Sequence, residues 1–224
     1  MISLAIDGDA RAYPVRILLW HEIVNDTVGG VPAMVTYCPL CNSAVVFDRR
    51  LDGRVLAFGN TGRIRHFDMV MYDRATGSWW QQFVGEAIVG ELTGRRLESI
   101  PARIKSLSRF RERHPVGRVL RPADPAARPY GATPFAGYDD WRGSTQFAQP
   151  LPEGLGPMAR VIVVGERAFS LALLRTAGRI AEDDLVITWE RGQNSIHDAQ
   201  VIAFGRDVGN VVVRRKTANG LADA

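Results

Sequence analysis

The chain of 224 residues is poor in cysteine and in lysine. Two cysteines are too few for a disulfide-rich scaffold. Lys105 and Lys216 are the only lysines, so nearly all of its 28 basic side chains are arginines. These arginines are scattered and form no basic stripe interleaved with aromatic residues, which a nucleic-acid surface requires. Despite a formal net charge of +4, we therefore expect no nucleic-acid partner.

Several sequence signals are missing as well. No apolar run is long enough for a transmembrane segment. The first eight residues have neither a basic start nor a cleavage site, so this chain shows no signal peptide and begins instead as a strand that turns at Asp7-Gly8. A nucleophile elbow, a phosphate loop and paired catalytic carboxylates are also lacking. The sequence thus contains no recognisable catalytic constellation beyond its cysteine pair.

Short apolar runs separated by turns predict a mostly β, β-rich α+β fold. Strands are expected at 31–37, 43–47, 55–58 and 67–72. One clear helix is expected at 102–114, where Ile104, Leu107 and Phe110 share a face and Pro115 stops the helix, and a shorter one at 15–24. A segment rich in Pro, Gly, Ala and Asp follows. We predict an N-terminal β-unit at 1–120, an extended connector at 121–157, and a second β-unit at 158–224 packed on the first.

Three segments in the second half of the chain are similar in sequence to segments in the first half. Residues 8–18 resemble 165–174, residues 36–43 align without gaps to 188–195, and residues 55–59 match 201–205. Three matches in the same order indicate two related β-units. The second copy has Glu190 and Gln193 in place of the two cysteines. The turn therefore does not require thiols in order to form.

The two cysteines form the motif Cys38-Pro39-Leu40-Cys41. Such a pair can close a disulfide, exchange with another thiol or hold a soft metal ion. Thioredoxin-type pairs begin a helix, whereas residues 43–48 here are strand-like. A metal-binding knuckle fits better, because Asn42 tolerates the left-handed conformation that such a turn needs.

A metal ion held by Cys38 and Cys41 requires further ligands. The candidates are His66, Met69 and Met71, in the segment 65–71, together with His21 or a carboxylate. If 65–71 is a strand, Met69 and Met71 share one face, and His66 shares the other with Asp68. Thiolate, thioether and imidazole ligands suit copper(I), and two cysteines with two histidines suit zinc.

Longer motifs resemble a known family. Among them are Ala12-Tyr13-Pro14, the motifs at 21–26, 36–41 and 73–79, and the segment 130–138. On these residues the chain resembles, over nearly its whole length, the bacterial and archaeal family called domain of unknown function 3179 (DUF3179). The family has no established activity. Its members usually carry an upstream segment and often an export signal, so the resemblance implies an N-terminally shortened member with a periplasmic or otherwise extracytoplasmic location.

Three functions are compatible with these observations. In the first, Cys38 and Cys41 bind copper or zinc, with His66, Met69 or His21 completing the site, and a protein or metal-donor partner loads it. In the second, the pair is a thiol–disulfide redox centre. In the third, the protein is a non-catalytic binding module that uses an aromatic surface at Trp79-Trp80.

Overall fold

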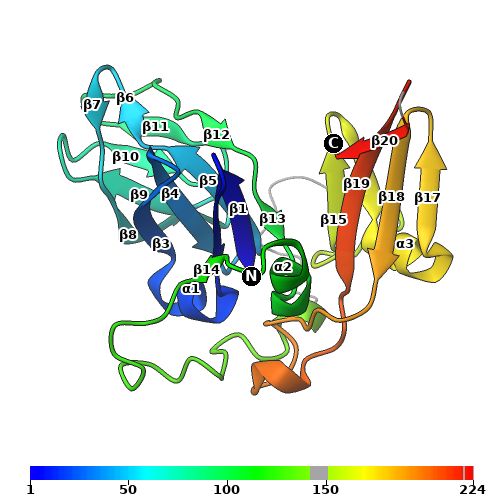
Figure 1. Cartoon of the computed structure of the whole chain (residues 1–224). Helices are drawn as coiled ribbons and strands as arrows, with labels where there is room; N and C mark the ends of the chain where they lie inside the picture. The colour runs from blue at the N-terminus through cyan, green and yellow to red at the C-terminus, as the bar shows by residue number, and fades with distance from the viewer. Residues whose placement is uncertain (142–150, 219, 224) are drawn as a thin grey trace. The chain divides into compact units, whose positions relative to one another are not determined.

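The computed structural model describes residues 1–141, 151–218 and 220–223. The chain divides into two compact units, Met1–Tyr130 and Gly131–Ala224. Strands predominate in both units (Figure 1), which confirms the mostly β, β-rich α+β fold. The division lies inside the predicted connector 121–157, of which residues 142–150 are outside the described part of the chain.

The first unit contains three four-stranded sheets and a small hairpin. One sheet has the order β13-β1-β2-β14, with strands Arg103–Ile104, Ile2–Ile6, Asp9–Tyr13 and Arg118–Val119. The next has the order β12-β5-β4-β3, with strands Ser99–Ile100, Ser43–Asp48, Val31–Cys38 and Ile23–Val28. The third has the order β11-β10-β9-β8, with strands Glu86–Val89, Trp79–Gln81, Asp68–Asp73 and Phe58–Arg65. The hairpin consists of β6 (Arg50–Leu51) and β7 (Arg54–Val55).

The second and third of these sheets share one hydrophobic core. Met34, Cys38 and Phe47 come from β4 and β5, and Met71 and Trp80 from β9 and β10; all are buried in the same cluster. Burial of such side chains stabilises the fold by about 1.5–3 kcal/mol for each large apolar residue. The core thus reaches the cysteine motif, because Cys38 is both the last residue of β4 and a member of the cluster.

The described residues form three α-helices of seven residues each: α1 (Val15–His21), α2 (Leu107–Arg113) and α3 (Leu171–Ala177). None of these helices is long and apolar enough to cross a bilayer. The helix predicted at 102–114 begins later than expected, because Arg103–Ile104 pairs with β1 and Ser106 is the N-cap. Of the residues expected to share one helix face, Phe110 is buried, whereas Ile104 belongs to β13 and is exposed.

Two strand boundaries in the first unit also differ from the prediction. The predicted strand 55–58 is divided, since Val55 ends β7 and Phe58 begins β8. Residues 59–62 lie inside β8, where the pairing register with β9 shifts between Asn60 and Arg63. This shift marks a β-bulge.

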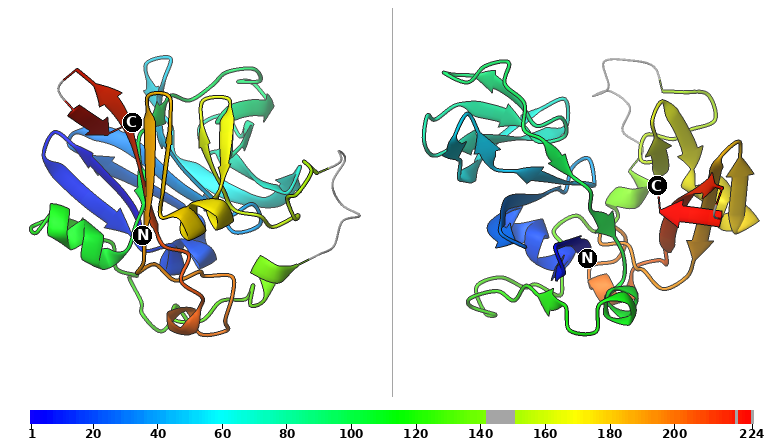
Figure 2. Two further views of the ribbon diagram at one scale, coloured as in Figure 1. Left: turned by 90° about the vertical axis from the view of Figure 1, so that its right-hand side faces the viewer. Right: turned by 45° about the horizontal axis from the view of Figure 1, so that its top comes forward.

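The second unit repeats the start of the first (Figure 2). The hairpin of β15 (Val161–Val164) and β16 (Arg167–Ser170) leads into α3, as the β1–β2 hairpin leads into α1. A hairpin of β17 (Arg179–Glu182) and β18 (Leu185–Glu190) follows, and Arg179 pairs with Thr188 as Ile23 pairs with Thr36. The first sequence match and the start of the second, 36–38 and 188–190, thus coincide with equivalent structure. The rest of the second match does not, because Cys38 pairs with Ser43 across a tight turn whereas Glu190 pairs with Asn210 across a long loop. The expectation that the same turn forms at 190–193 without thiols is therefore wrong.

The second unit also contains irregular segments and two further strands. The short helices η1 (Tyr138–Asp140) and η2 (Ile202–Phe204) lie in irregular segments. Strands β19 (Asn210–Thr217) and β20 (Gly220–Asp223) complete the sheet β17-β18-β19-β20. In the third sequence match, 201–205 contains η2 whereas 55–59 contains parts of β7 and β8, so this match does not reflect equivalent structure.

Candidate functional site

The cysteine motif forms the turn between β4 and β5, in which Cys38 pairs with Ser43 across the hairpin. Asn42 has a φ of 48°, which confirms the predicted left-handed conformation. Its side chain accepts a hydrogen bond of 2.7 Å from the Tyr37 hydroxyl. Because a strand follows the pair, neither thiol lies at the start of a helix, and the thioredoxin-type geometry is absent.

The two cysteines are free thiols in different environments. Cys38 is 1% exposed, and its sulfur lies 3.9 Å from the carbonyl oxygen of Phe67. Cys41 is exposed. Reagents in solvent therefore reach Cys41 far more readily than Cys38.

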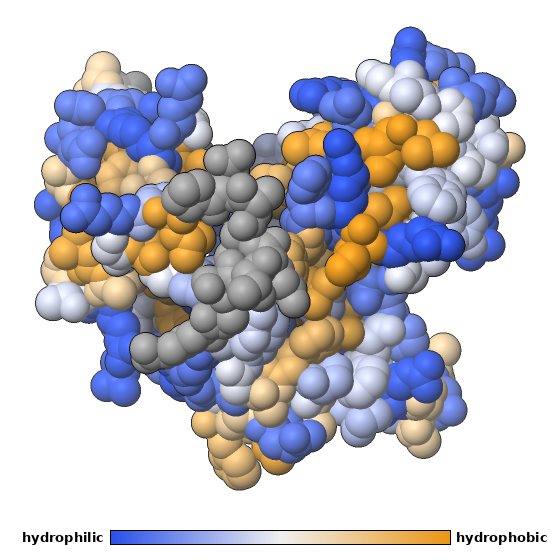
Figure 3. All heavy atoms as spheres, turned by 180° about the vertical axis from the view of Figure 1, so that it is seen from behind, coloured by the Kyte–Doolittle hydropathy of each residue, from blue (hydrophilic) through white to orange (hydrophobic). Residues whose placement is uncertain are grey.

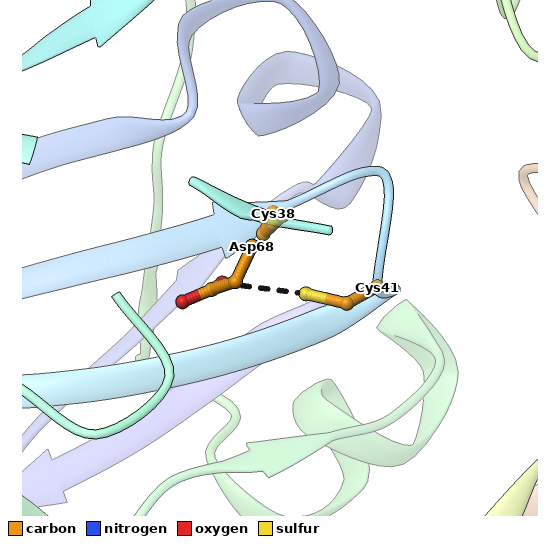
Figure 4. Close-up of side chains that lie close together, drawn as sticks. All are labelled: Cys38, Cys41 and Asp68. Carbon is orange, nitrogen blue, oxygen red and sulfur yellow. Dashed lines mark hydrogen bonds between the residues drawn. The ribbon is translucent and has the colours of Figure 1, made fainter. Parts of the chain in front are cut away.

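A carboxylate completes a cluster with the two thiols. Asp68, the first residue of β9, is 3% exposed and lies beside the pair (Figure 4). Its Oδ1 accepts a hydrogen bond of 3.4 Å from Cys41 Sγ, and its Oδ2 accepts one of 2.8 Å from the Phe83 backbone N–H. One ligand atom from each of Cys38, Cys41 and Asp68 lies within 4.8 Å of the other two.

His66 lies outside this cluster, although its segment contributes Asp68. His66 and Phe67 have φ values of 52° and 62° and form the two-residue turn between β8 and β9. Such φ values at both central positions are typical of a type I′ hairpin turn. The turn interrupts the strand expected at 65–71, so His66 is exposed and does not share a strand face with Asp68.

Met69 and His21 have other environments. Met69 is 3% exposed and packs in the core with Cys38. His21 is exposed at the end of α1, and its Nε2 lies 2.7 Å from the Tyr130 hydroxyl. The two rings are stacked, with centroids 5.7 Å apart. Like His66, His21 is not part of the group formed with Asp68.

The aromatic pair Trp79-Trp80 does not form the open surface that a binding module would use. Trp80 is fully buried, and Trp79 is half-buried with the Arg63 guanidinium 5.7 Å from its ring centroid. Among the described residues, the most accessible large hydrophobic side chains are those of Val116 and Phe204. Figure 3 shows hydrophobic residues on one face of the molecule interspersed with hydrophilic ones, which is normal for a folded protein.

Comparison with known proteins identifies the family. The family described as "Protein of unknown function (DUF3179)" matches residues 1–223. The chain belongs to the DUF3179 family. No curated protein and no solved structure shows significant similarity to it.

In this DUF3179 chain the two thiols differ in acidity. The Cys41 side chain lowers the pKa of Cys38 by hydrogen bonding, and the backbone N–H groups of Cys41 and Met69 lower it further, against the opposing effects of burial and Asp68. The Cys38 side chain in turn raises the pKa of Cys41. Of the two thiols, Cys38 is thus the one that loses its proton more readily.

A chain of hydrogen bonds leads from the carbonyl of Val45 to the sulfur of Cys41. Thr36 Oγ1 donates to the carbonyl of Val45, and Gln82 Nε2 donates to Thr36 Oγ1. Ser43 Oγ then donates to Gln82 Oε1 across 2.9 Å. Ser43 Oγ, at the end of this chain, lies within hydrogen-bond distance of Cys41 Sγ, at 3.0 Å.

The ligands predicted from sequence included residues of the segment 65–71 and an unspecified carboxylate, but not Asp68 by number, and neither Ser43 nor Gln82. Asp68 begins β9 directly after the turn, and its backbone aligns opposite Arg65. A buried carboxylate needs a partner, and this rule could have pointed to Asp68 as part of a site. The burial of Asp68, however, cannot be inferred from its neighbours in sequence. Gln82 is fully buried although amide side chains are mostly exposed.

Proposed function

We propose that this protein binds a zinc ion through Cys38, Cys41 and Asp68. The observation that carries the proposal is the convergence of two thiols and a carboxylate within 4.8 Å. With bonds of about 2.3 Å to sulfur and about 2.0 Å to oxygen, the sulfur–oxygen edge of a zinc tetrahedron is about 3.5 Å. The Cys41 Sγ–Asp68 Oδ1 distance of 3.4 Å matches this edge.

The ligand set favours zinc over copper. A carboxylate is a hard ligand that suits zinc, whereas copper(I) prefers thioether and thiolate sulfur. The thioether proposed for copper belongs to Met69, whose side chain packs in the core. The imidazoles proposed for either metal belong to His66 and His21, which lie outside the group.

Three protein ligands leave a fourth zinc position open. Zinc sites that act on a substrate or exchange the ion keep one position for water or an incoming ligand, whereas purely structural sites are closed by four protein ligands. Cys41 is exposed, so an incoming ligand can approach from its side. The proposal therefore includes a small molecule or a metal-donor protein as the fourth ligand.

The experiment measures zinc in protein purified without a histidine tag, and zinc affinity by competition with a chromogenic chelator. We expect one zinc per chain in the wild type, loss of zinc in Cys38→Ser/Cys41→Ser, and weaker binding in Asp68→Asn. His66→Gln is the matched control and should bind as the wild type does. Equal zinc content in the wild type and the double cysteine variant overturns the proposal.

A thiol–disulfide function is the second candidate, favoured by the opposite pKa shifts of the two free thiols. Its weakness is that the more acidic thiol, Cys38, is buried, while the exposed Cys41 is kept protonated. A thiolate must reach the partner disulfide in order to attack it. Measurement of the reduction potential tests this candidate: a potential in the range of known oxidoreductases supports it, and inert thiols refute it.

The location outside the cytoplasm is part of the same proposal and is supported by the family resemblance alone. Cell fractionation of a strain that carries the natural full-length gene tests it, with periplasmic recovery expected. The absence of a nucleic-acid partner stays a prediction from the scattered arginines.

A further inference from the structure

Glu22 has a backbone conformation that is unfavourable for a residue with a side chain. It is the C-cap of α1, with φ 59° and ψ −34°, and its backbone N–H donates to the carbonyl of Leu18. Residues other than glycine rarely adopt positive φ, and this ψ lies outside the left-handed helical region that asparagine tolerates. Such strain is found preferentially at functional positions.

The internal repeat shows that the fold does not need glutamate here. The equivalent C-cap of α3 is Gly178, with φ 71° and ψ −32°. The carbonyl of Glu22 accepts a hydrogen bond from the Tyr37 N–H, and the carbonyl of Gly178 accepts one from the Trp189 N–H. Tyr37 and Trp189 are themselves equivalent in the aligned sequences. Glycine therefore performs the same backbone role without the strain.

The Glu22 side chain meets a second irregular position. Its Oε2 accepts a hydrogen bond from Asn60 Nδ2. Asn60 lies where β8 bulges, and its Oδ1 accepts a hydrogen bond of 2.7 Å from the Gly62 N–H. Bulges commonly re-aim a side chain next to a functional site. Two departures from regular structure, at the end of a helix and within a strand, thus bring a carboxylate and a carboxamide together.

This pair leaves hydrogen-bonding capacity for a ligand. Asn60 is exposed and Glu22 is half-buried, so both can be reached from solvent. Within the described residues, Glu22 Oε1 accepts no hydrogen bond, and the second N–H of the Asn60 amide has no acceptor. An acceptor and a donor therefore lie side by side.

The chemistry of the pair selects a class of ligand. The Glu22 carboxylate repels anions, and the Asn60 N–H repels a simple cation. Two neighbouring hydroxyl groups satisfy both atoms, because one O–H donates to Oε1 and the adjacent oxygen accepts from the amide. We propose that Glu22 and Asn60 form a binding site for a neutral polyhydroxylated ligand, and that Glu22 is retained there at a cost in stability. This site is independent of the zinc proposal.

The first test is the thermal stability of Glu22→Gly. Removal of the strain is expected to raise Tm by about 2–6 °C for a chain of this size. Gly178→Ala is the matched control: it places a side chain in the same conformation of the second copy and should lower Tm. A marked fall in Tm of Glu22→Gly shows that the fold does need the glutamate and overturns the proposal.

The second test is a titration with methyl α-glucoside, followed by the NMR signals of the side-chain amides. We expect the Asn60 signals to shift in the wild type and not in Glu22→Gly, whose fold the first test verifies. The Asn25 amide, which makes two hydrogen bonds with the backbone of Phe58, is an internal control and should not move. Equal shifts in both proteins, or none in the wild type, overturn the proposal.

Discussion

The indole Nε1 of Trp80 donates a hydrogen bond of 3.0 Å to Asp73 Oδ2 in the interior of the first unit, and both residues are 0% exposed. Burial alone raises the pKa of Asp73, but hydrogen bonds from Trp80, Thr76 and Ala75 outweigh it and lower that pKa. The carboxylate is therefore ionised in the folded protein and fully surrounded by donors, which ties the 73–78 turn to the core.

Trp80→Phe removes one of these donors while keeping an aromatic ring in the core. A buried acceptor that loses a partner costs about 1–3 kcal/mol. We expect the free energy of unfolding in urea to fall by that amount. Trp79→Phe is the control and should change it less, since Trp79 is half-buried. Equal losses in the two variants contradict the role assigned to the Trp80–Asp73 bond.

Ser43→Ala tests whether the hydrogen bond between Ser43 and Cys41 orients the sulfur for the proposed zinc ion. Loss of a partner that orients a metal ligand commonly lowers affinity about 10–100-fold. We expect a loss of this size in the chelator competition assay. Thr93→Ala removes an exposed hydroxyl bonded to Gly90 and should leave affinity unchanged. Wild-type affinity in Ser43→Ala refutes the orienting role.

His197 makes the second unit sensitive to mild acid. Burial lowers its pKa to about 4, with a further contribution from Arg160 and an opposing one from Asp139. The unfolded chain binds the proton near pH 6.5, so the stability due to the neutral ring is present above that pH and is lost as the pH falls toward 4. The expected loss is about 3 kcal/mol.

The measurement for His197 is hydrogen exchange of the amides of β18 between pH 7 and 4, corrected for the intrinsic rate. Phe135 and Tyr138 surround the ring, and its Nε2 has no hydrogen-bond partner in the described part of the chain, so His197→Phe should keep the packing and flatten the pH dependence. His66→Gln should leave that dependence as it is. A pH dependence unchanged in His197→Phe contradicts the assignment.

Gly29 and Gly30 form a matched pair for the cost of steric crowding. Both have positive φ, of 54° and 79°. A Cβ at Gly29 would lie 2.3 Å from the carbonyl oxygen of Ile6, whereas one at Gly30 meets nothing within 4 Å. We expect Gly30→Ala to cost about 1 kcal/mol from backbone strain alone, and Gly29→Ala to cost clearly more. Similar denaturation midpoints for the two variants contradict this expectation.

Local chemistry explains which parts of the fold could be predicted. The turns at Asp7-Gly8 and Asp52-Gly53 and the left-handed Asn42 follow from residues that tolerate positive φ. The turn at His66-Phe67 could not be found in this way, because neither residue is typical of it and the flanking residues continue an apolar strand pattern. The helix α3 was missed, although the match of its sequence to 8–18, which leads into α1, contained the signal.

The candidate site was predictable only in part. The cysteine spacing identified the turn, but Asp68 reaches Cys41 because two hairpins from different sheets pack against one core. Gln82 reaches Ser43 from the end of β10 for the same reason. Contacts of this kind depend on how sheets pack, which residue spacing within one strand does not encode.

The N-terminal sheet has a consequence for synthesis of the protein. Strand β1 needs β13 as a neighbour, and β2 needs β14, yet these partners lie more than 90 residues further along the chain. At about 5–20 residues per second, β1 and β2 exist on the ribosome for about 5–20 s with one edge each unpaired. The polar residues Asp9 and Arg11 on β2 carry charge at that edge throughout this interval, which opposes pairing with a neighbouring nascent chain.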